Sequence, residues 1–190
     1  MKADPDARSQ SSLVRDDKAL RISLGPMPTD RKLRTVDERT VNAPLDAIFD
    51  VAANVLEWPK HLRHYRYVKF RSRSADGGGI VEMSANRPFG AINWPTWWVS
   101  AMLVNPPKAS ARPSIRFRHI EGITTGMDVE WEFEPKSSGV THVRIVHVWN
   151  GPRWPVVGGV AARGVIGPVF VHGIAARTLE GLANVAEGLA

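Results

Sequence analysis

Much of the chain consists of segments in which apolar and polar residues alternate. The clearest is "MDVEWEFEP", where Val129, Trp131 and Phe133 share one side and Glu130 and Glu132 share the other. Such alternation is typical of a β-strand with one buried and one solvated face. Turn-rich segments such as "ADGGG", "NPPKASARP" and "KSSG" separate the runs, so we expect adjacent antiparallel strands. The predicted strands cover residues 66–74, 79–85, 92–104, 114–120, 127–135 and 140–149, after a first strand within 34–44.

Two regions have the spacing of amphipathic helices instead. Residues 45–59 place Ile48, Phe49 and Ala52 at helical intervals, and a short helical stretch, "WPKHLRHY", follows. The C-terminal region has one apolar helical stripe, with charged residues on the opposite side. The stripe consists of Val171, Ile174, Ala175, Thr178, Leu182, Val185 and Leu189.

The order of elements is strand, two short helices, six strands and a long helix. This order predicts an α+β fold in which the last helix covers the one apolar face of an antiparallel sheet of about seven strands. A strongly curved sheet around such a helix would leave a space between them.

Residues 1–31 are rich in charged residues, Ser and Pro and show little apolar periodicity. We expect a disordered N-terminal arm over 1–31 and one folded domain over 32–190. A chain of 190 residues with 43% apolar content is near the size of one domain with a substantial core.

Composition excludes several classes of protein. The chain has no cysteine, which removes disulfides, thiolate metal sites and cysteine nucleophiles together. No uninterrupted apolar run is long enough to span a membrane, and the first thirty residues contain no apolar segment of signal-peptide type. We therefore expect a cytoplasmic protein.

A net charge of +6 and an isoelectric point near 10.1 raise the question of an anionic partner. Basic residues cluster between positions 63 and 73, but Lys69, Arg71 and Arg73 alternate with other residues as on one solvated strand face. Nucleic-acid binding predicts aromatic residues interleaved on that face, and this strand supplies only Tyr67. We expect no nucleic-acid partner, and a transient contact with a membrane surface is left open.

No motif indicates a metal or a cofactor. His61 and His64 are three residues apart, but no HExxH motif or nearby third ligand accompanies them. The segment "ADGGG" lacks the helix and lysine that hold phosphates, and the chain has no G-x-S-x-G motif. We expect neither a metal nor a cofactor.

Three segments together resemble a known superfamily. They are "VNAPLDAIFDVAANVLEWPKHLRHY", "VEWEFEP…SGVTHVRIVHVW" and "FVHGIAARTLEGLANVAE", and they resemble the START-like, or Bet v 1-like (SRPBCC), superfamily over about residues 34–189. That superfamily includes Bet v 1 allergens, polyketide aromatase/cyclases and coenzyme-Q-binding proteins. The resemblance implies a helix-grip fold with a hydrophobic cavity between the sheet and the last helix.

The polyketide aromatase/cyclases of this superfamily line their cavity with aromatic residues. Trp58 and Tyr65 resemble the tryptophan and tyrosine that follow the first helix, and Trp98 and Trp131 resemble cavity tryptophans. That family also carries an arginine four residues beyond the middle-strand tryptophan, where this chain has Met102. A thioether cannot donate a proton, so the difference weakens the expectation of aromatase chemistry.

Tyr65 and His147 are the candidate catalytic residues, and each has two interpretations. Tyr65 is either an aromatic core residue or a phenol that donates to a carbonyl. His147 shares strand parity with Ile145, so it is either a hydrogen-bonded core histidine or a group that moves a proton in the cavity. Arg118 has the opposite parity to Phe117 and is expected to point to solvent.

Two glycines complete the candidate site. Gly164 and Gly167 continue the helical stripe backward from Val171, and they either leave volume for a ligand or form a loop with left-handed turns. Apolar residues that would complete the wall are added to the aromatic positions. The candidate ligand-binding residues are Trp58, Tyr65, Met83, Trp98, Met102, Phe117, Met127, Trp131, Gly164, Gly167 and Val171.

We therefore expect a protein that binds a hydrophobic or aromatic small molecule, such as a lipid, a quinone or a polyketide-like compound, without catalysis. The alternative is a polyketide cyclase or aromatase that folds and cyclises a poly-β-ketone in the same cavity, with Tyr65 as the acid. Met102 favours the binding protein. The sequence identifies neither the ligand nor the oligomeric state.

Overall fold

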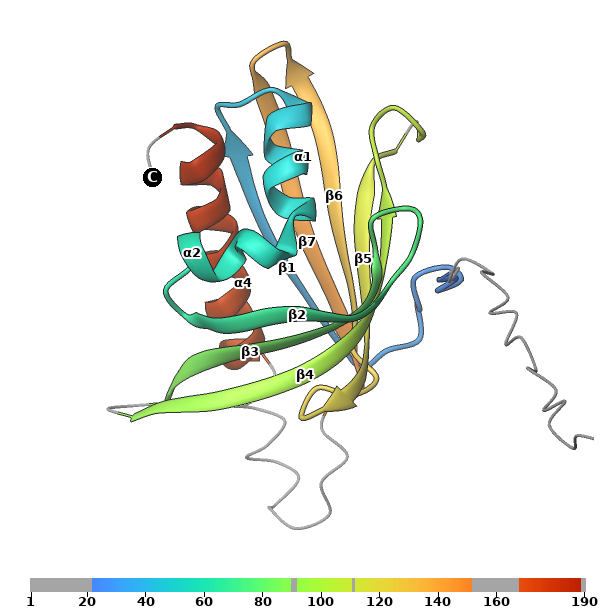
Figure 1. Ribbon diagram of the computed structural model, residues 1–190, viewed down its shortest axis with the longest axis vertical. Coiled ribbons are helices and arrows are strands. Elements are labelled where there is room, and N and C mark those ends of the chain that lie inside the picture. The colour runs from blue at the N-terminus through green and yellow to red at the C-terminus, as the bar shows by residue number, and fades with distance from the viewer. Residues whose placement is uncertain (1–21, 90–91, 111, 152–167, 189–190) are drawn as a thin grey trace, which may run out of the picture.

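The computed structural model describes residues 22–89, 92–110, 112–151 and 168–188, with the side chains of 87–94 and 168–172 left out. Seven strands form one antiparallel sheet in the order β1-β7-β6-β5-β4-β3-β2 (Figure 1). The strands are β1 (Leu33–Val41), β2 (Tyr65–Arg73), β3 (Gly79–Phe89), β4 (Ile92–Asn105), β5 (Ser114–Gly122), β6 (Asp128–Ser137) and β7 (Val140–Trp149). The helices are α1 (Leu45–Ala53), a 3-10 turn η1 (Val55–Glu57), α2 (Trp58–His61) and α4 (Pro168–Ala186).

The sheet curves around α4, with α1 and α2 beside it (Figure 1). The predicted α+β helix-grip fold, with about seven antiparallel strands and a long C-terminal helix, is confirmed. The first helical region is more broken than its periodicity predicts. Asn54 ends α1, and Pro59 lies in the first turn of a new helix, where proline is favoured. Tyr65, placed in the helical stretch by the sequence, begins β2 instead.

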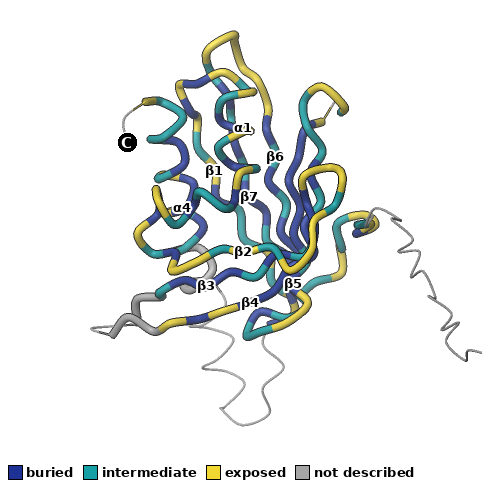
Figure 2. The backbone as a smooth tube through the Cα atoms, viewed as in Figure 1, coloured by how far each residue is buried: buried dark blue, intermediate teal, exposed yellow. Residues whose placement is uncertain are grey.

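The apolar stripe of α4 faces the sheet as predicted. Leu182 and Ala183 are fully buried, whereas Arg177 and Glu180 are exposed. Figure 2 shows the buried residues concentrated where the strands face the helices. Gly181 lies against the side chain of Leu62, the residue that follows α2, so a side chain at position 181 would require Leu62 to shift. Among the described helices, none is long and apolar enough to cross a membrane.

The outer face of the sheet also has buried residues. Leu24 is 6% exposed, and the Arg116 guanidinium donates a hydrogen bond to the Gly25 carbonyl, so the segment before β1 lies against β5. Burial raises the pKa of Glu130, and the charge of Arg116 beside it acts in the opposite direction. The boundary of the predicted arm at residue 31 stays a prediction, because residues 1–21 lie outside the described part of the chain.

The packing of α4 yields a stability prediction. Leu182→Ala removes a fully buried side chain from the core, and we expect it to lower the free energy of unfolding by about 2–5 kcal/mol. Urea unfolding followed by circular dichroism measures this change. Glu180→Ala, on the exposed side of the same helix, is the matched control and should change it by less than about 0.5 kcal/mol. Equal effects of the two substitutions would contradict this packing.

Candidate functional site

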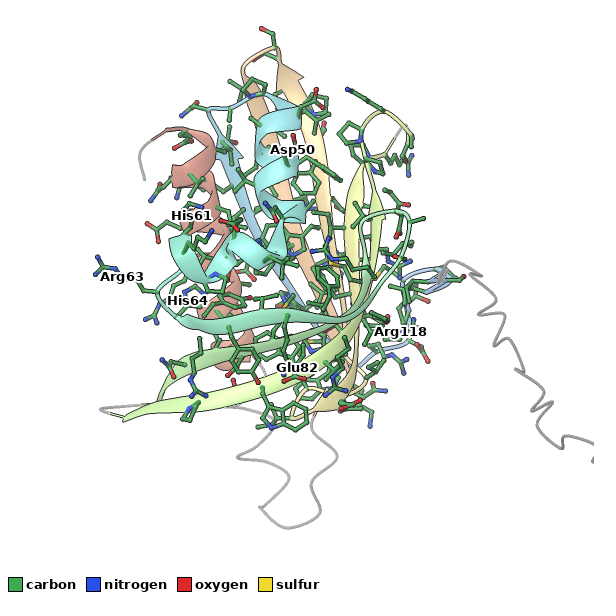
Figure 3. The ribbon with its side chains drawn as sticks, in the orientation of Figure 1. Asp50, His61, Arg63, His64, Glu82 and Arg118 are labelled. Atoms are coloured by element: carbon green, nitrogen blue, oxygen red, sulfur yellow. The ribbon has the colours of Figure 1, made fainter. Side chains whose placement is uncertain are left out.

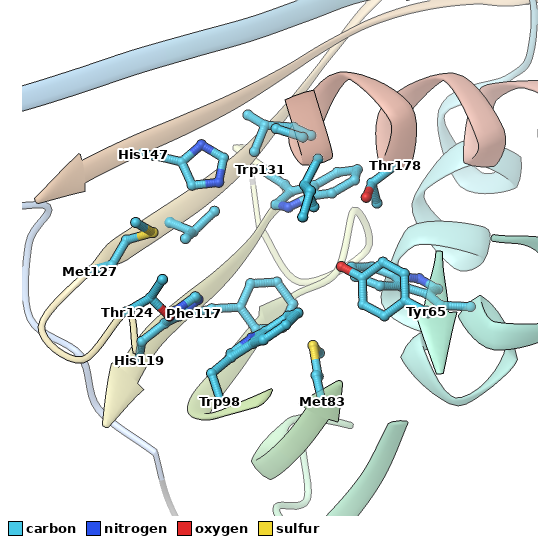
Figure 4. Close-up of a pocket in the computed structure, with 15 residues that line it drawn as sticks. Tyr65, Met83, Trp98, Phe117, His119, Thr124, Met127, Trp131, His147 and Thr178 are labelled. Atoms are coloured by element: carbon cyan, nitrogen blue, oxygen red, sulfur yellow. Dashed lines mark hydrogen bonds between the residues drawn. The ribbon is translucent and has the colours of Figure 1, made fainter. Parts of the chain in front are cut away.

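A cavity lies between the concave face of the sheet and α4 (Figure 4). Strands β2 to β7 contribute to its wall, and α2 and α4 close it from the helix side. The lining side chains leave about 70 Å³ of space open to a water-sized molecule. The described residues that line it are Trp58, Tyr65, Met83, Trp98, Phe117, His119, Thr124, Met127, Val129, Trp131, Ile145, His147, Ile174, Ala175 and Thr178.

Trp58 is the centre of an aromatic cluster in this wall. Its ring lies 5.2 Å from that of Tyr65 in an edge arrangement, 5.8 Å from Trp131 and 6.3 Å from Phe117, measured between centroids. Tyr65 extends the cluster to Trp98, whose ring centroid is 6.1 Å away. Edge and tilted contacts at these separations are favourable beyond the area that they bury, so the wall is pre-organised.

The indole of Trp58 has a buried donor that is not used. Trp58 is 3% exposed, and its Nε1 is buried without a hydrogen-bond partner. A buried N–H left unpaired costs about 1–3 kcal/mol relative to one that is satisfied. An acceptor atom on a molecule in the cavity would remove this cost.

Tyr65 and Thr178 supply polar groups at one end of the cavity. Figure 4 shows the Tyr65 hydroxyl pointing toward the interior of the pocket, with Thr178 of α4 nearby. His64, at the start of β2 beside α4 (Figure 3), shares a hydrogen bond of 3.0 Å between its Nε2 and Thr178 Oγ1. This bond connects α4 to the residue that precedes β2.

Two histidines lie at the other end, with Met127 and Thr124 between them in the view of Figure 4. His119 stacks on Trp98 at 5.9 Å, and its Nδ1 is 2.5 Å from Thr124 Oγ1. The stacking and the hydrogen bond together fix the orientation of the His119 ring. His147 lines the cavity from β7, opposite Val129 on the neighbouring strand.

The first strand adds buried polar groups beside His147. Thr35 pairs with His147 in the ladder, and its Oγ1 is buried without a hydrogen-bond partner. Asp37 is 4% exposed and pairs with Ile145, a cavity residue.

Most of the sequence-predicted residues come together in this cavity. Trp58, Tyr65, Met83, Trp98, Phe117, Met127, Trp131 and His147 all line it. Met102 is fully buried but is not among the described lining residues, because it lies further along β4, between Gly79 and Phe117. Gly164 and Gly167 lie outside the described residues, as does the side chain of Val171.

The prediction for Arg118 also agrees with the geometry. Arg118 points away from the cavity, and its Nε donates to Asp128 Oδ1 at 2.7 Å on the outer face. No arginine therefore stands in for Met102 among the described lining residues. The described residues also contain no group of three ligands that could hold a metal ion.

The sequence reasoning did not select His119, Thr124 and Thr178. His119 has the strand parity of Phe117, which was a usable signal. Thr178 falls on the apolar stripe of the last helix. It is a polar residue on that stripe, and its hydroxyl lines the cavity and bonds His64. Thr124 lies in the turn between β5 and β6, and no local pattern indicates that its side chain returns to the cavity.

The His119–Thr124 contact can be tested directly. Thr124→Val keeps the shape of the side chain and removes the hydroxyl, so we expect a loss of about 1 kcal/mol in unfolding free energy and a more mobile imidazole. Urea unfolding and ¹⁵N NMR of the histidine ring measure the two effects. Thr29→Val, at an exposed position before β1, is the control. A ring whose tautomer and order are unchanged in Thr124→Val would rule out this positioning role.

Comparisons with known proteins agree with this fold. The protein TTHA0849 from Thermus thermophilus has 16% sequence identity and a TM-score of 0.68, over 83% of this chain and 99% of that chain. The Zhui aromatase/cyclase from a Streptomyces species has 19% identity and a TM-score of 0.65, over 82% and 93%. A START superfamily protein from Mycobacterium smegmatis has 16% identity and a TM-score of 0.57, over 82% and 94%.

At these identities the solved structures establish the fold alone. A comparison with curated proteins gave no match. A family model described as polyketide cyclase/dehydrase and lipid transport matches residues 41–167, which is well over half of the chain. The chain therefore belongs to the polyketide cyclase/dehydrase and lipid transport family.

Proposed function

We propose that the protein binds a small aromatic molecule with a hydrogen-bond acceptor in the cavity beneath α4, as a binding or carrier protein. The observation that carries this proposal is the buried, unpartnered Nε1 of Trp58 in a wall of aromatic rings. Apolar pockets with a few convergent polar groups are typical of small-molecule sites. Quinones and aromatic ketones combine a ring with a carbonyl oxygen and fit this chemistry.

The size of the cavity limits how such a ligand enters. A space of about 70 Å³ exceeds what a single water needs, but it is below the roughly 300–1,000 Å³ of pockets that hold drug-sized ligands. The ligand is therefore small, or the walls move apart when it binds. Met83 and Met127 in the wall have flexible, unbranched side chains that can adjust to it.

A pair of ligands tests the role of the Trp58 donor. Naphthalene and 1,4-naphthoquinone have the same ring frame, and only the quinone has acceptor oxygens. We expect the quinone to bind the wild-type protein more tightly. Trp58→Phe should reduce this preference about five-fold, since one hydrogen bond is worth about 1 kcal/mol.

Equilibrium titration, monitored by quenching of tryptophan fluorescence, measures both affinities. Trp97→Phe, on the outer face of β4, is the control and should leave the preference for the quinone unchanged. An unchanged preference in Trp58→Phe rejects the hydrogen bond. Failure of the wild-type protein to bind either compound saturably rejects these aromatic ligands.

A second candidate is a cyclase that folds a poly-β-ketone in the same cavity. Its support is that two groups that can transfer protons line the wall, Tyr65 at one end and His147 at the other, with His119 at the same end as His147 (Figure 4). The Tyr65 hydroxyl points into the pocket, where it can protonate or hydrogen-bond a carbonyl oxygen (Figure 4). The methionine at position 102 supports the binding protein instead, since the arginine of the resembling enzymes is absent.

Turnover of a synthetic poly-β-ketone, followed by mass spectrometry of the cyclised products, separates the two candidates. If the protein is a cyclase, Tyr65→Phe should slow product formation by about 10²–10⁴-fold while ligand affinity stays within a few-fold. Tyr67→Phe, on the opposite face of β2, is the matched control. A wild-type rate equal to that of buffer alone rejects the cyclase and leaves the binding protein.

A further inference from the structure

The outer face of β2 to β5 carries an unusual group of apolar side chains. In the described part of the chain, the large hydrophobic residues that are exposed are Tyr67 (36%), Trp97 (48%) and Ile120 (41%). The ladder pairs Tyr67 with Ser84 and Ser84 with Trp97, so the two aromatic residues lie in one row across three strands. Ile120 lies on the next strand, β5. Single exposed apolar residues are ordinary, but a group on one face indicates an interaction surface.

Charged groups surround these side chains in a layered arrangement. Glu82 of β3 is the centre: its carboxylate accepts hydrogen bonds from Tyr67 Oη at 2.9 Å and from Arg71 Nε at 3.0 Å, and it lies 3.1 Å from Lys69 Nζ. Arg71 also reaches Glu121 of β5 at 2.7 Å. The side chain of Glu82 is only 12% exposed, whereas Lys69 is 60% and Arg71 40% exposed. The acid therefore lies beneath the cations, which are outermost.

Arg66 adds a charge that no acid balances. It is exposed on β2, and its Nη1 donates to Ser84 Oγ at 3.4 Å, between Tyr67 and Trp97 in the ladder. It forms no ion pair with another described residue. Around Tyr67 and Trp97, the three cations Arg66, Lys69 and Arg71 thus face the two acids Glu82 and Glu121, on a chain whose net charge is +6.

We propose that this basic-aromatic face, defined by Arg66, Tyr67, Lys69, Arg71, Trp97 and Ile120, docks transiently on an anionic phospholipid surface. Trp and Tyr are enriched at the headgroup level of membranes because their rings are apolar with one polar group. Each Lys or Arg near an anionic surface contributes about 1 kcal/mol of attraction. The face combines both features, with Ile120 as an additional apolar contact.

The inner face of the same strands lines the cavity, which places the cavity behind the proposed membrane-docking face. Tyr65, Met83 and Trp98, which line the cavity, are near neighbours in sequence of the residues that define the face. In the view of Figure 3, Glu82 lies on β3 away from helices α1 and α2. A docked bilayer would thus be separated from the cavity by one sheet, about 10 Å. The docking itself does not depend on which molecule occupies the cavity or on catalysis.

Sedimentation with vesicles tests the proposal. We expect the full chain to bind vesicles of phosphatidylcholine mixed with phosphatidylglycerol and to bind vesicles of phosphatidylcholine alone far more weakly. Arg66→Glu combined with Lys69→Glu should lower binding about ten-fold or more, because two attractive charges become repulsive. Trp97→Ser should lower it several-fold without changing its dependence on salt.

Lys136→Glu is the charge-reversal control, because Lys136 is also exposed and ion-paired, to Glu134, but lies near the end of β6. It should bind vesicles as the wild type does. Circular dichroism and the unfolding midpoint establish that each variant is folded. Equal binding to both kinds of vesicle, or equal losses in Lys136→Glu and the double variant, would overturn the proposal. Duplex DNA that competes with vesicles, with an affinity that Trp97→Ser does not change, would also overturn the proposal. A concentration-dependent dimer that forms without vesicles and is abolished by Trp97→Ser would overturn it as well.

Discussion

One long helix and two short ones have to cover the concave face of a seven-stranded sheet, and the rest of the structure depends on how they do so. The sheet presents apolar side chains from every strand, and α4 is long enough to bury only part of them. Where α1 packs beside α4, around Leu182 and Phe49, the core is filled. Further along, toward Ala175 and Ile174, the space between the layers is filled by large rings from the sheet and is not completely closed. The cavity is therefore a consequence of covering a wide curved sheet with one long helix and two short ones.

The aromatic residues keep the incompletely filled space between the sheet and α4 open. Rings such as Trp58 and Trp131 bury much surface with few rotatable bonds, so they can form a wall that holds its shape beside an incompletely filled space. Small or flexible residues there would let the sheet and helix collapse together. The same rigidity explains why the Trp58 donor stays unpaired: the ring contacts fix the indole in a position where no acceptor of a described residue reaches it.

The sequence predicted the fold well because the burial pattern of a half-buried sheet is local. Alternation in residues 127–135 identified the inner face of β6, and parity alone placed His147 inward and Arg118 outward. Parity says which face a residue occupies but not where along the strand a cavity ends, so Met102 was included although it lies in the core past the cavity. Irregular backbone also escaped the pattern: a bulge between Phe70 and Ser72 leaves the Arg73 guanidinium 4.5 Å above the Phe70 ring. The Thr124 contact and the unpaired Trp58 donor depend on three-dimensional orientation, which no spacing rule encodes.

Trp97 and Trp98 are consecutive in β4, yet one is 48% exposed and the other 4% exposed. Their opposite environments depend entirely on the register of the strand, because the side-chain period is two. Insertion of one residue before this pair would move Trp97 into the inward position of Trp98, and would move Trp98 to the outer face in the position of Val99. The cavity would keep an indole, but the second indole would replace the fully buried Val99. What fixes the register is the ladder elsewhere, including the pairing of Met83 with Trp98 and the stacking of His119 on that ring. At this point in the chain, the strand register alone decides which of two identical residue types faces the cavity and which faces solvent.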